Sequence, residues 1–193
     1  MQVVAGPSGS GKSSLFPVAA AGIDHFNIDD RCAQLNRGSY LGIRPEFRAQ
    51  ANAECEAFIA QHIASRTSFA VETTLRTDIT FRQGKAARAN GFVLLMEYIS
   101  AGSPQECVKR VSIRADRGGH SASPAKVRTT YAASLENLPR ALREFDVVSV
   151  YDNSRRGKPP TRVLDAAAGR GVTFRATKLP AWLRHLLRGP EFA

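Results

Sequence analysis

The sequence predicts an α/β protein built on one doubly wound parallel sheet. Apolar runs of strand length alternate along the chain with amphipathic helical stretches, and a glycine-rich turn joins the first strand to the first helix. This alternation is typical of βα units, whose strands run parallel. The 193 residues, 43% of them hydrophobic, are enough for one domain and too few for two with a linker. We therefore expect a single domain over residues 1–193.

The expected strands are short apolar runs bounded by polar or glycine-containing segments. In chain order they cover residues 2–5, 25–28, 68–71, 92–99 and 146–151. The run over residues 92–99 is the longest, so we place it at the centre of the sheet, where both faces are covered. A further strand over residues 172–176 is expected at an edge.

Helices are expected where apolar residues recur at helical spacing between these strands. In chain order they cover residues 12–21, 45–65, 78–90, 104–115, 124–145 and 179–187. Pro45 suits the first turn of the second helix, and Gly91 is a good stop for the third. Pro139 is expected to bend the fifth helix, and Trp182 to face inward from the last.

Charge and cysteine content indicate the environment of the protein. Lys and Arg number 27 against 17 Asp and Glu, so the net charge is +10 and the pI is near 10.2. A basic protein attracts nucleic acid, membrane surfaces or phosphorylated small molecules. No apolar run approaches the roughly 18 residues that cross a bilayer, and the N-terminus lacks the pattern of a signal peptide. The three cysteines have neither metal-ligand nor disulfide spacing. We expect a cytoplasmic protein with reduced thiols and no membrane partner.

Residues 6–13, Gly-Pro-Ser-Gly-Ser-Gly-Lys-Ser, match the P-loop pattern G-x-x-x-x-G-K-[ST]. Its glycines let backbone amides wrap a phosphate, and the following helix presents its positive end to the same anion. Lys12 is expected to reach the β- and γ-phosphates, and Ser13 to ligate Mg²⁺. The expected nucleotide-binding residues of this segment are Gly6, Pro7, Ser8, Gly9, Ser10, Gly11, Lys12, Ser13 and Ser14. A chance glycine-serine turn is the alternative, but a strand precedes the motif and a helix follows it, as a phosphate site requires.

A P-loop occurs in kinases, GTPases, motors and transporters, and the size of this chain favours a small kinase. The guanine-reading motif N-K-x-D of a GTPase is absent from the sequence. We therefore expect a P-loop nucleoside-triphosphate hydrolase fold of the mononucleotide kinase type, with a helical lid and with ATP and Mg²⁺ as cofactors.

Polar residues follow several of the expected strands, at the edge where ligands bind in doubly wound sheets. Asp29 follows the second strand, where a general base for an acceptor hydroxyl belongs. Its alternative role is a helix N-cap, for which Asp30 is an equal candidate. Glu72-Thr73-Thr74 follows the third strand, and a partly desolvated glutamate there needs substrate, metal-bound water or an ion pair. Asn153 follows the fifth strand and either contacts the nucleotide base or shapes the turn.

Arg110, Arg114 and Arg117 recur four and three residues apart, so they share one face of the predicted helix. Stacked like charges repel unless an anion lies between them, and phosphoryl transfer needs a cationic clamp on the γ-phosphate. A double glycine after them would let residues 105–125 move as a lid. The alternative is a solvated basic face. His120 is either a contact from the lid to the substrate or an ordinary loop histidine.

The order of these motifs resembles the zeta toxin family in its compact form of small P-loop kinases. The matching segments are residues 6–13, 26–29, 69–75, 110–120, 131–138 and 150–154, within residues 1–155. The resemblance implies transfer of the ATP γ-phosphate to the 3′-hydroxyl of the amino sugar in UDP-N-acetylglucosamine. It also implies that Asp29 is the base, that Glu72 orients the substrate and that the lid arginines clamp the γ-phosphate. Many relatives carry consecutive arginines before Tyr131, whereas only Arg128 is present here. Any antitoxin is expected to be a separate chain.

Three hypotheses for the function follow. The first is an ATP-dependent kinase of a small hydroxyl-bearing acceptor such as a UDP-sugar. The second is a polynucleotide 5′-hydroxyl kinase or an antibiotic phosphotransferase. The net charge favours a nucleic-acid substrate, but the chain lacks an interleaved aromatic and basic track for single strands. The third is a nucleotide-binding regulatory module without turnover, which would have no need of Asp29 beside the γ-phosphate.

Overall fold

A computed structural model describes residues 1–187, and these residues form one seven-stranded sheet with the order β2-β3-β1-β4-β5-β6-β7. The strands are β1 (Gln2–Ala5), β2 (Asp24–Phe26), β3 (Phe69–Thr73), β4 (Leu95–Ser100), β5 (Val147–Asp152), β6 (Thr161–Ala167) and β7 (Gly171–Arg175). From β2 to β5 every neighbouring pair is parallel, whereas β6 and β7 add antiparallel strands beside β5. The predicted parallel α/β core is confirmed and carries an antiparallel extension.

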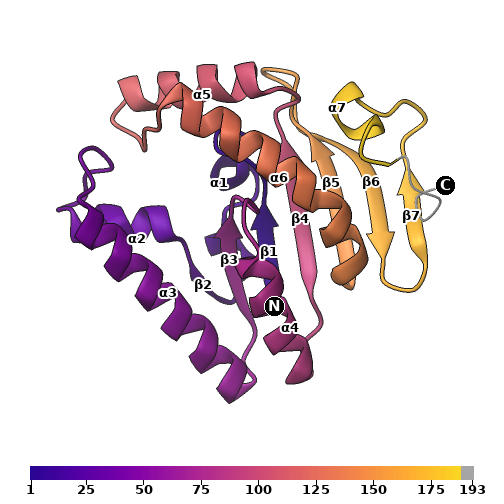
Figure 1. Ribbon diagram of the computed structural model, residues 1–193, viewed down its shortest axis with the longest axis horizontal. Helices are drawn as coiled ribbons and strands as arrows, with labels where there is room; N and C mark the ends of the chain where they lie inside the picture. Colours follow the sequence, from indigo (N-terminus) through magenta and orange to yellow (C-terminus); the bar gives the residue numbers. More distant parts are fainter. Residues whose placement is uncertain (188–193) are drawn as a thin grey trace.

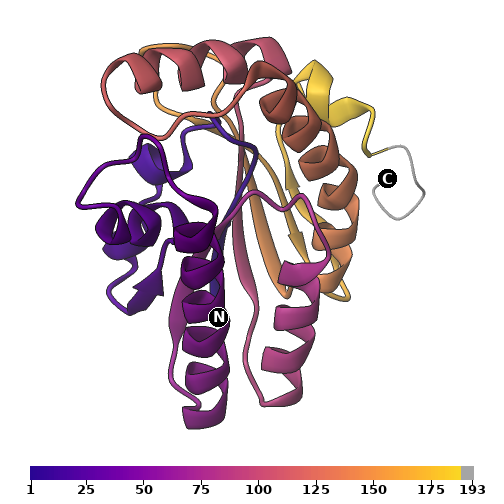
Figure 2. The same cartoon turned by 60° about the vertical axis from the view of Figure 1, so that its left-hand side comes forward.

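Helices cover the two faces of the sheet unequally. They are α1 (Lys12–Leu15), α2 (Ile28–Leu35), α3 (Pro45–Ser65), α4 (Ile79–Ala89), α5 (Pro104–Asp116), α6 (Pro124–Glu144), α7 (Ala181–Arg184) and the 3₁₀ helix η1 (Val18–Ala21). Figure 1 and Figure 2 show α3, α4 and α6 together on one side of the sheet, with α5 crossing above the end of β1. None of the helices in residues 1–187 has the length and apolar character to cross a membrane.

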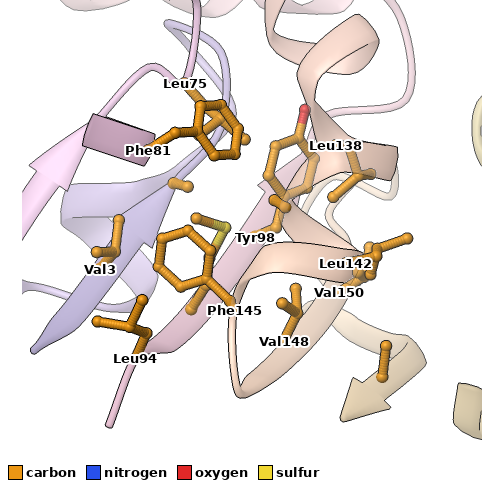
Figure 3. Close-up of a cluster of buried hydrophobic side chains, with 14 of the residues drawn as sticks. Val3, Leu75, Phe81, Leu94, Tyr98, Leu138, Leu142, Phe145, Val148 and Val150 are labelled. Carbon is orange, nitrogen blue, oxygen red and sulfur yellow. The ribbon is translucent and has the colours of Figure 1, made fainter. Parts of the chain in front are cut away.

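The main core lies between the sheet and helices α3, α4 and α6. Phe81, Tyr98, Leu138 and Phe145 are almost completely buried there, and Figure 3 shows their side chains converging from separate elements. Each buried side chain of this size contributes roughly 1.5–3 kcal/mol. The Tyr98 hydroxyl lies 3.0 Å from the Ser134 hydroxyl, so the buried phenol keeps a hydrogen-bond partner.

The helix predicted over residues 12–21 is wrong in length. The structure has the single turn α1, and then Pro17 precedes η1. Proline disfavours helical geometry in the residue before it, and Phe16 accordingly has φ −134 and ψ 64. The chain therefore leaves the helix after Leu15 and turns towards β2.

The strand predicted over residues 25–28 is also wrong at its end, because Asn27 starts a helix. The Asn27 side chain accepts hydrogen bonds from the amides of Asp29 and Asp30, which places both aspartates in the first turn of α2. The N-cap of α2 is therefore Asn27 and neither of the two aspartates considered for it.

The C-terminal third differs most from prediction. Strand β6 was not predicted, because Arg162 and Asp165 interrupt its apolar pattern, and the structure shows that they pair with each other. The edge strand predicted over residues 172–176 is confirmed as β7. The last helix is only one turn, and Trp182 is half-buried and donates to Asp152 at 2.9 Å. Helix α6 runs through Pro139 without ending.

Candidate active site

The P-loop, residues 6–13, adopts a conformation that its glycines make possible. Gly6, Gly9 and Gly11 have φ values of 141, 79 and 101, in the region that side chains rarely adopt. A Cβ on Gly6 would lie 2.1 Å from the Ile99 carbonyl oxygen, and one on Gly9 would lie 2.6 Å from the Cys107 carbonyl oxygen. The loop is therefore packed directly against β4 and α5. Because α1 is a single turn, its dipole is smaller than the predicted helix would supply.

Lys12 is turned into this loop and is only 6% exposed. Its ammonium donates to the carbonyl oxygens of Gly6 at 2.8 Å and Pro7 at 3.2 Å, and lies 3.7 Å from Glu72. The Ser10 hydroxyl is buried and has no hydrogen-bond partner among the described residues. A buried cation and an orphaned hydroxyl inside a glycine loop fit a phosphate group, whose oxygens accept from both.

Glu72, at the end of β3, contacts the side chains of Lys12, Ser13 and Asn27. Its carboxylate accepts from the Ser13 hydroxyl at 2.8 Å and from the Asn27 side-chain amide at 3.3 Å, besides pairing with Lys12. The partly desolvated glutamate expected from the sequence is thus surrounded by donors. No group of three or more His, Cys, Asp or Glu among residues 1–187 is placed to hold a metal. A Mg²⁺ here would rest on Ser13 and nucleotide oxygens, with Glu72 beside it.

The other residues after β3 have different surroundings. The Thr73 hydroxyl lies 3.1 Å from the Thr80 hydroxyl and accepts from the Leu75 amide at 3.1 Å, so it shapes the turn that follows the strand. Thr74 is half-buried beside it. Ser14, on α1, is exposed.

Asp29 lies between a helix and the predicted lid. One carboxylate oxygen accepts from Arg48 of α3 at 2.6 Å, and the other lies 3.9 Å from His120 Nε2. Burial by itself would raise the pKa of Asp29, but His120, Arg48 and Lys12 outweigh burial and hold that pKa below its usual value. The carboxylate is therefore ionised at neutral pH, as a proton acceptor must be.

The lid arginines separate into two groups. Arg110 donates to Glu106 and to the Asn153 carbonyl oxygen, both at 2.8 Å, and Arg114 donates to the His120 carbonyl oxygen at 3.1 Å. Arg114 and Arg117 are both exposed, in the last turn of α5 and directly after it. The structure thus joins Arg110 to Asn153 beside the P-loop, whereas Arg114 contacts the loop that carries His120.

His120 is half-buried in the loop that follows α5. Burial is the largest influence on the pKa of His120 and lowers it. The negative charge of Asp29 raises this pKa, and the positive charge of Arg114 lowers it further. The pKa of His120 lies below its ordinary value, so its ring is mostly neutral at pH 7. Arg128, the remaining arginine before Tyr131, is exposed on α6.

Asn153 braces the P-loop from the end of β5. Its side-chain amide donates to the Ser10 carbonyl oxygen at 2.8 Å, while its own carbonyl oxygen accepts from Arg110. A Cβ on Gly11 would come within 2.5 Å of that amide nitrogen. These contacts favour the structural alternative for Asn153, which joins the P-loop to α5.

Two residues near Asp29 were not identified from the sequence. Arg48 lies three and seven residues before Ala51 and Cys55, which are buried on one face of α3. An apolar residue would be expected at this position, so the arginine there was the sequence signal that could have identified it. Tyr40 donates to Asp30 at 2.8 Å from the loop that joins α2 to α3. No sequence pattern connects Tyr40 with the site, because the contact depends on how that loop folds.

Solved structures similar to this chain share its fold, although no protein-family model and no curated protein matches it. One is from the PezAT chromosomal toxin-antitoxin system of Streptococcus pneumoniae, with a TM-score of 0.58 and 14% identity over 86% of this chain and 71% of that chain. A second is AvrRxo1-ORF1:-ORF2 with ATP, with a TM-score of 0.67 and 15% identity over 88% of this chain and 58% of that chain. A third is a proposed kinase from Chloroflexus aurantiacus, with a TM-score of 0.52 and 19% identity over 68% of this chain and 77% of that chain.

These similarities define the class of the fold, which is an α/β fold with a mostly parallel sheet and a P-loop after the first strand. The predicted resemblance to the zeta toxin family is confirmed at the level of fold. At identities of 14 to 19%, these matches show that the fold is shared. The activity has to be argued from the residues of the site. This chain also spans little more than half the length of the AvrRxo1 chain that it matches.

Proposed function

We propose that this chain is an ATP-dependent kinase that transfers the γ-phosphate to a hydroxyl group of a small acceptor. The observation that carries the proposal is that a P-loop lysine and an ionised aspartate are connected through two side chains, those of Glu72 and Asn27. Glu72 contacts Lys12 and Ser13 on the nucleotide side and Asn27 on the other, and Asn27 caps the helix that carries Asp29. A module that only binds nucleotide has no need of this second half.

In the proposed reaction, the P-loop amides and Lys12 hold the β- and γ-phosphates, for which Lys12 exchanges its carbonyl and Glu72 contacts. Asp29 accepts the proton of the acceptor hydroxyl. Arg110 and Arg114 lie on the lid helix that packs on the P-loop, where guanidinium groups stabilise the charge of the transferred phosphoryl group. Ser13 would supply a hydroxyl ligand to a Mg²⁺ ion, which would neutralise charge on the phosphate oxygens.

We propose further that the acceptor is anionic and of the UDP-N-acetylglucosamine type. A cavity of about 260 Å³ opens between α6 and the loop that follows Glu72. Its lining residues are Arg76, Lys126, Thr129, Thr130 and Ala133. The two basic side chains in this cavity, Arg76 and Lys126, suit a diphosphate, which accepts charge-assisted hydrogen bonds from such groups. The net charge of +10 supports an anionic acceptor in the same way.

Mass spectrometry of a mixed acceptor pool tests this proposal. The pool contains UDP-N-acetylglucosamine, other nucleotide sugars, NAD, an aminoglycoside and a 5′-hydroxyl oligonucleotide, incubated with ATP, Mg²⁺ and the protein. We expect one added phosphate on the UDP-sugar with the wild type and with Asp30→Asn, and none with Asp29→Asn. Asp30 is a matched control because it adjoins Asp29 in the same helical turn. Phosphate on the oligonucleotide or the aminoglycoside would reject the UDP-sugar, and ATP binding without any product would favour a regulatory module.

The similar structures also support a proposed protein partner. One of them belongs to a system described as a toxin-antitoxin system. Another contains AvrRxo1-ORF1 together with AvrRxo1-ORF2. We propose that a separate antitoxin chain binds this protein and blocks its kinase activity. Growth of cells that express the wild type or Asp29→Asn tests the first requirement, since only an active toxin needs neutralisation. Equal growth of both strains would remove the reason for an antitoxin.

A further inference from the structure

Two ion pairs connect α2 to α3, and only one of them involves the proposed base. Arg48 of α3 binds Asp29 of α2 at 2.6 Å, and Arg31 of α2 binds Glu54 of α3 through two of its nitrogens. Both pairs are partly exposed and tie the same two helices together. If the role of Arg48 were only to hold the helices, the two pairs would be interchangeable.

The carboxylate of Asp29 presents its two oxygens to different neighbours. Oδ1 is taken by Arg48, whereas Oδ2 faces His120 Nε2 at 3.9 Å. A hydroxyl oxygen can lie about 2.8 Å from each of two atoms that are less than about 5.6 Å apart, to one side of the line that joins them. Asp29 Oδ2 and His120 Nε2, 3.9 Å apart, are therefore close enough for one hydroxyl group to bridge them from the side.

We propose that Arg48 is a positioning residue that reserves Oδ1 of Asp29, so that the acceptor hydroxyl binds between Asp29 Oδ2 and His120 Nε2. This inference rests on the proposed kinase function and names the atoms that hold its acceptor. The acceptor oxygen forms a bond to the γ-phosphorus, the bond from that phosphorus to the bridging oxygen breaks, and the electron pair leaves with ADP. The hydroxyl proton passes to Asp29 Oδ2 and then to solvent.

The charges around Asp29 agree with this arrangement. Arg48 of α3, His120 of the lid loop and Lys12 of α1 all face it, and each lowers its pKa against the effect of burial. When a phosphate draws Lys12 away, Arg48 remains the permanent cation beside the carboxylate, because the pKa of His120 is itself lowered by burial. A neutral imidazole then offers one hydrogen bond to the acceptor hydroxyl without a competing positive charge.

Titration of Asp29 by NMR tests the inference without requiring catalysis. Protein with ¹³C-labelled aspartate is titrated as wild type, Arg48→Met, Arg48→Lys and Arg31→Met, and Asp29→Asn assigns the resonance. We expect Arg48→Met to raise the pKa of Asp29, Arg48→Lys to restore it in part and Arg31→Met to leave it unchanged. An unchanged pKa in Arg48→Met, or an equal shift in Arg31→Met, would overturn the positioning role.

Kinetics with ATP and UDP-N-acetylglucosamine supply the second arm. Arg48→Met should lower kcat about tenfold or more, because a mispositioned base loses proton-transfer efficiency, and should move the acidic limb of the kcat profile to higher pH. The KM for ATP should stay within about twofold, since Arg48 does not touch the P-loop. An equal loss in Arg31→Met would contradict the inference. Absence of product with wild type would instead count against the proposed acceptor, and the NMR titration would still decide the role of Arg48.

Discussion

Replacing Glu72 by glutamine tests how the charge of Lys12 is balanced in the P-loop. Glutamine keeps the size of the side chain and its hydrogen-bonding reach but removes the negative charge 3.7 Å from the Lys12 ammonium. Two unit charges at this separation attract by about 4 to 5 kcal/mol at an effective dielectric constant of about 20. Most of that attraction is offset by desolvation, since the side chains of Lys12 and Glu72 are only 7% and 12% exposed.

The net effect is smaller than the loss of a fully buried ion pair, because Lys12 keeps its bonds to the carbonyl oxygens of Gly6 and Pro7. We expect Glu72→Gln to lower the free energy of unfolding by about 2 kcal/mol in buffer without nucleotide. For a chain of this size, that loss lowers Tm by about 4 to 8 °C. The γ-phosphate of ATP supplies a replacement charge, so ATP should stabilise the variant more than it stabilises the wild type.

Thermal unfolding with and without ATP, in the absence of Mg²⁺, measures both effects. Glu54→Gln is the control, because Glu54 also pairs with a cationic side chain, that of Arg31, but lies on α3 and has no contact with Lys12 among the described ion pairs. The ATP-dependent rise in Tm should be unchanged in that variant. The reasoning is refuted if Glu72→Gln without nucleotide melts at the wild-type temperature. It is also refuted if ATP raises the Tm of Glu72→Gln and the Tm of the wild type by the same amount.

Three further predictions concern the packing around the site. Gly6→Ala should cost about 3 kcal/mol or more and abolish ATP binding in a titration, because its Cβ would lie 2.1 Å from the Ile99 carbonyl oxygen. Burial raises the pKa of Glu97, so its charge is unfavourable in the folded protein above that pKa. Glu97→Gln should therefore raise Tm at pH 7, with no gain below about pH 4, where the wild-type side chain is neutral in both states. Tyr98→Phe should cost about 1 to 2 kcal/mol in denaturant unfolding because it orphans the Ser134 hydroxyl, and Ser134→Ala in the same chain should recover part of that loss.

The parts of the fold that depend on local rules were predictable from the sequence. The P-loop, the Pro45 start of α3 and the strand at the centre of the sheet all follow from neighbouring residues. The broken first helix was predictable in principle, because Pro17 disfavours helical geometry at Phe16, although α6 does continue through Pro139. The start of α2 was missed since Asn27, Asp29 and Asp30 are all good caps, and only the structure shows which side chain accepts the amide hydrogens.

The long-range contacts of the site were beyond prediction for a physical reason. Arg48 and Asp29 are 19 residues apart, on two helices whose relative placement depends on the loop between them. Strand β6 has a charged pair within it, so its apolar pattern becomes clear only when Arg162 and Asp165 are seen to neutralise each other. Sequence patterns report which face a residue occupies, but pairing between elements is decided by packing.

The proposed nucleotide half and the proposed acceptor half of the site share one hydrogen-bond network, and this constrains how they can work. Phosphates that attract Lys12 and Ser13 must compete with Glu72, which also holds the Asn27 amide. The Asn27 oxygen in turn accepts from the amides at the start of α2, next to Asp29. A change at the P-loop therefore has a short route to Asp29, the proposed base, through the side chains of Glu72 and Asn27. Such a short route favours ordered binding, in which nucleotide sets the position of Asp29 before the acceptor arrives.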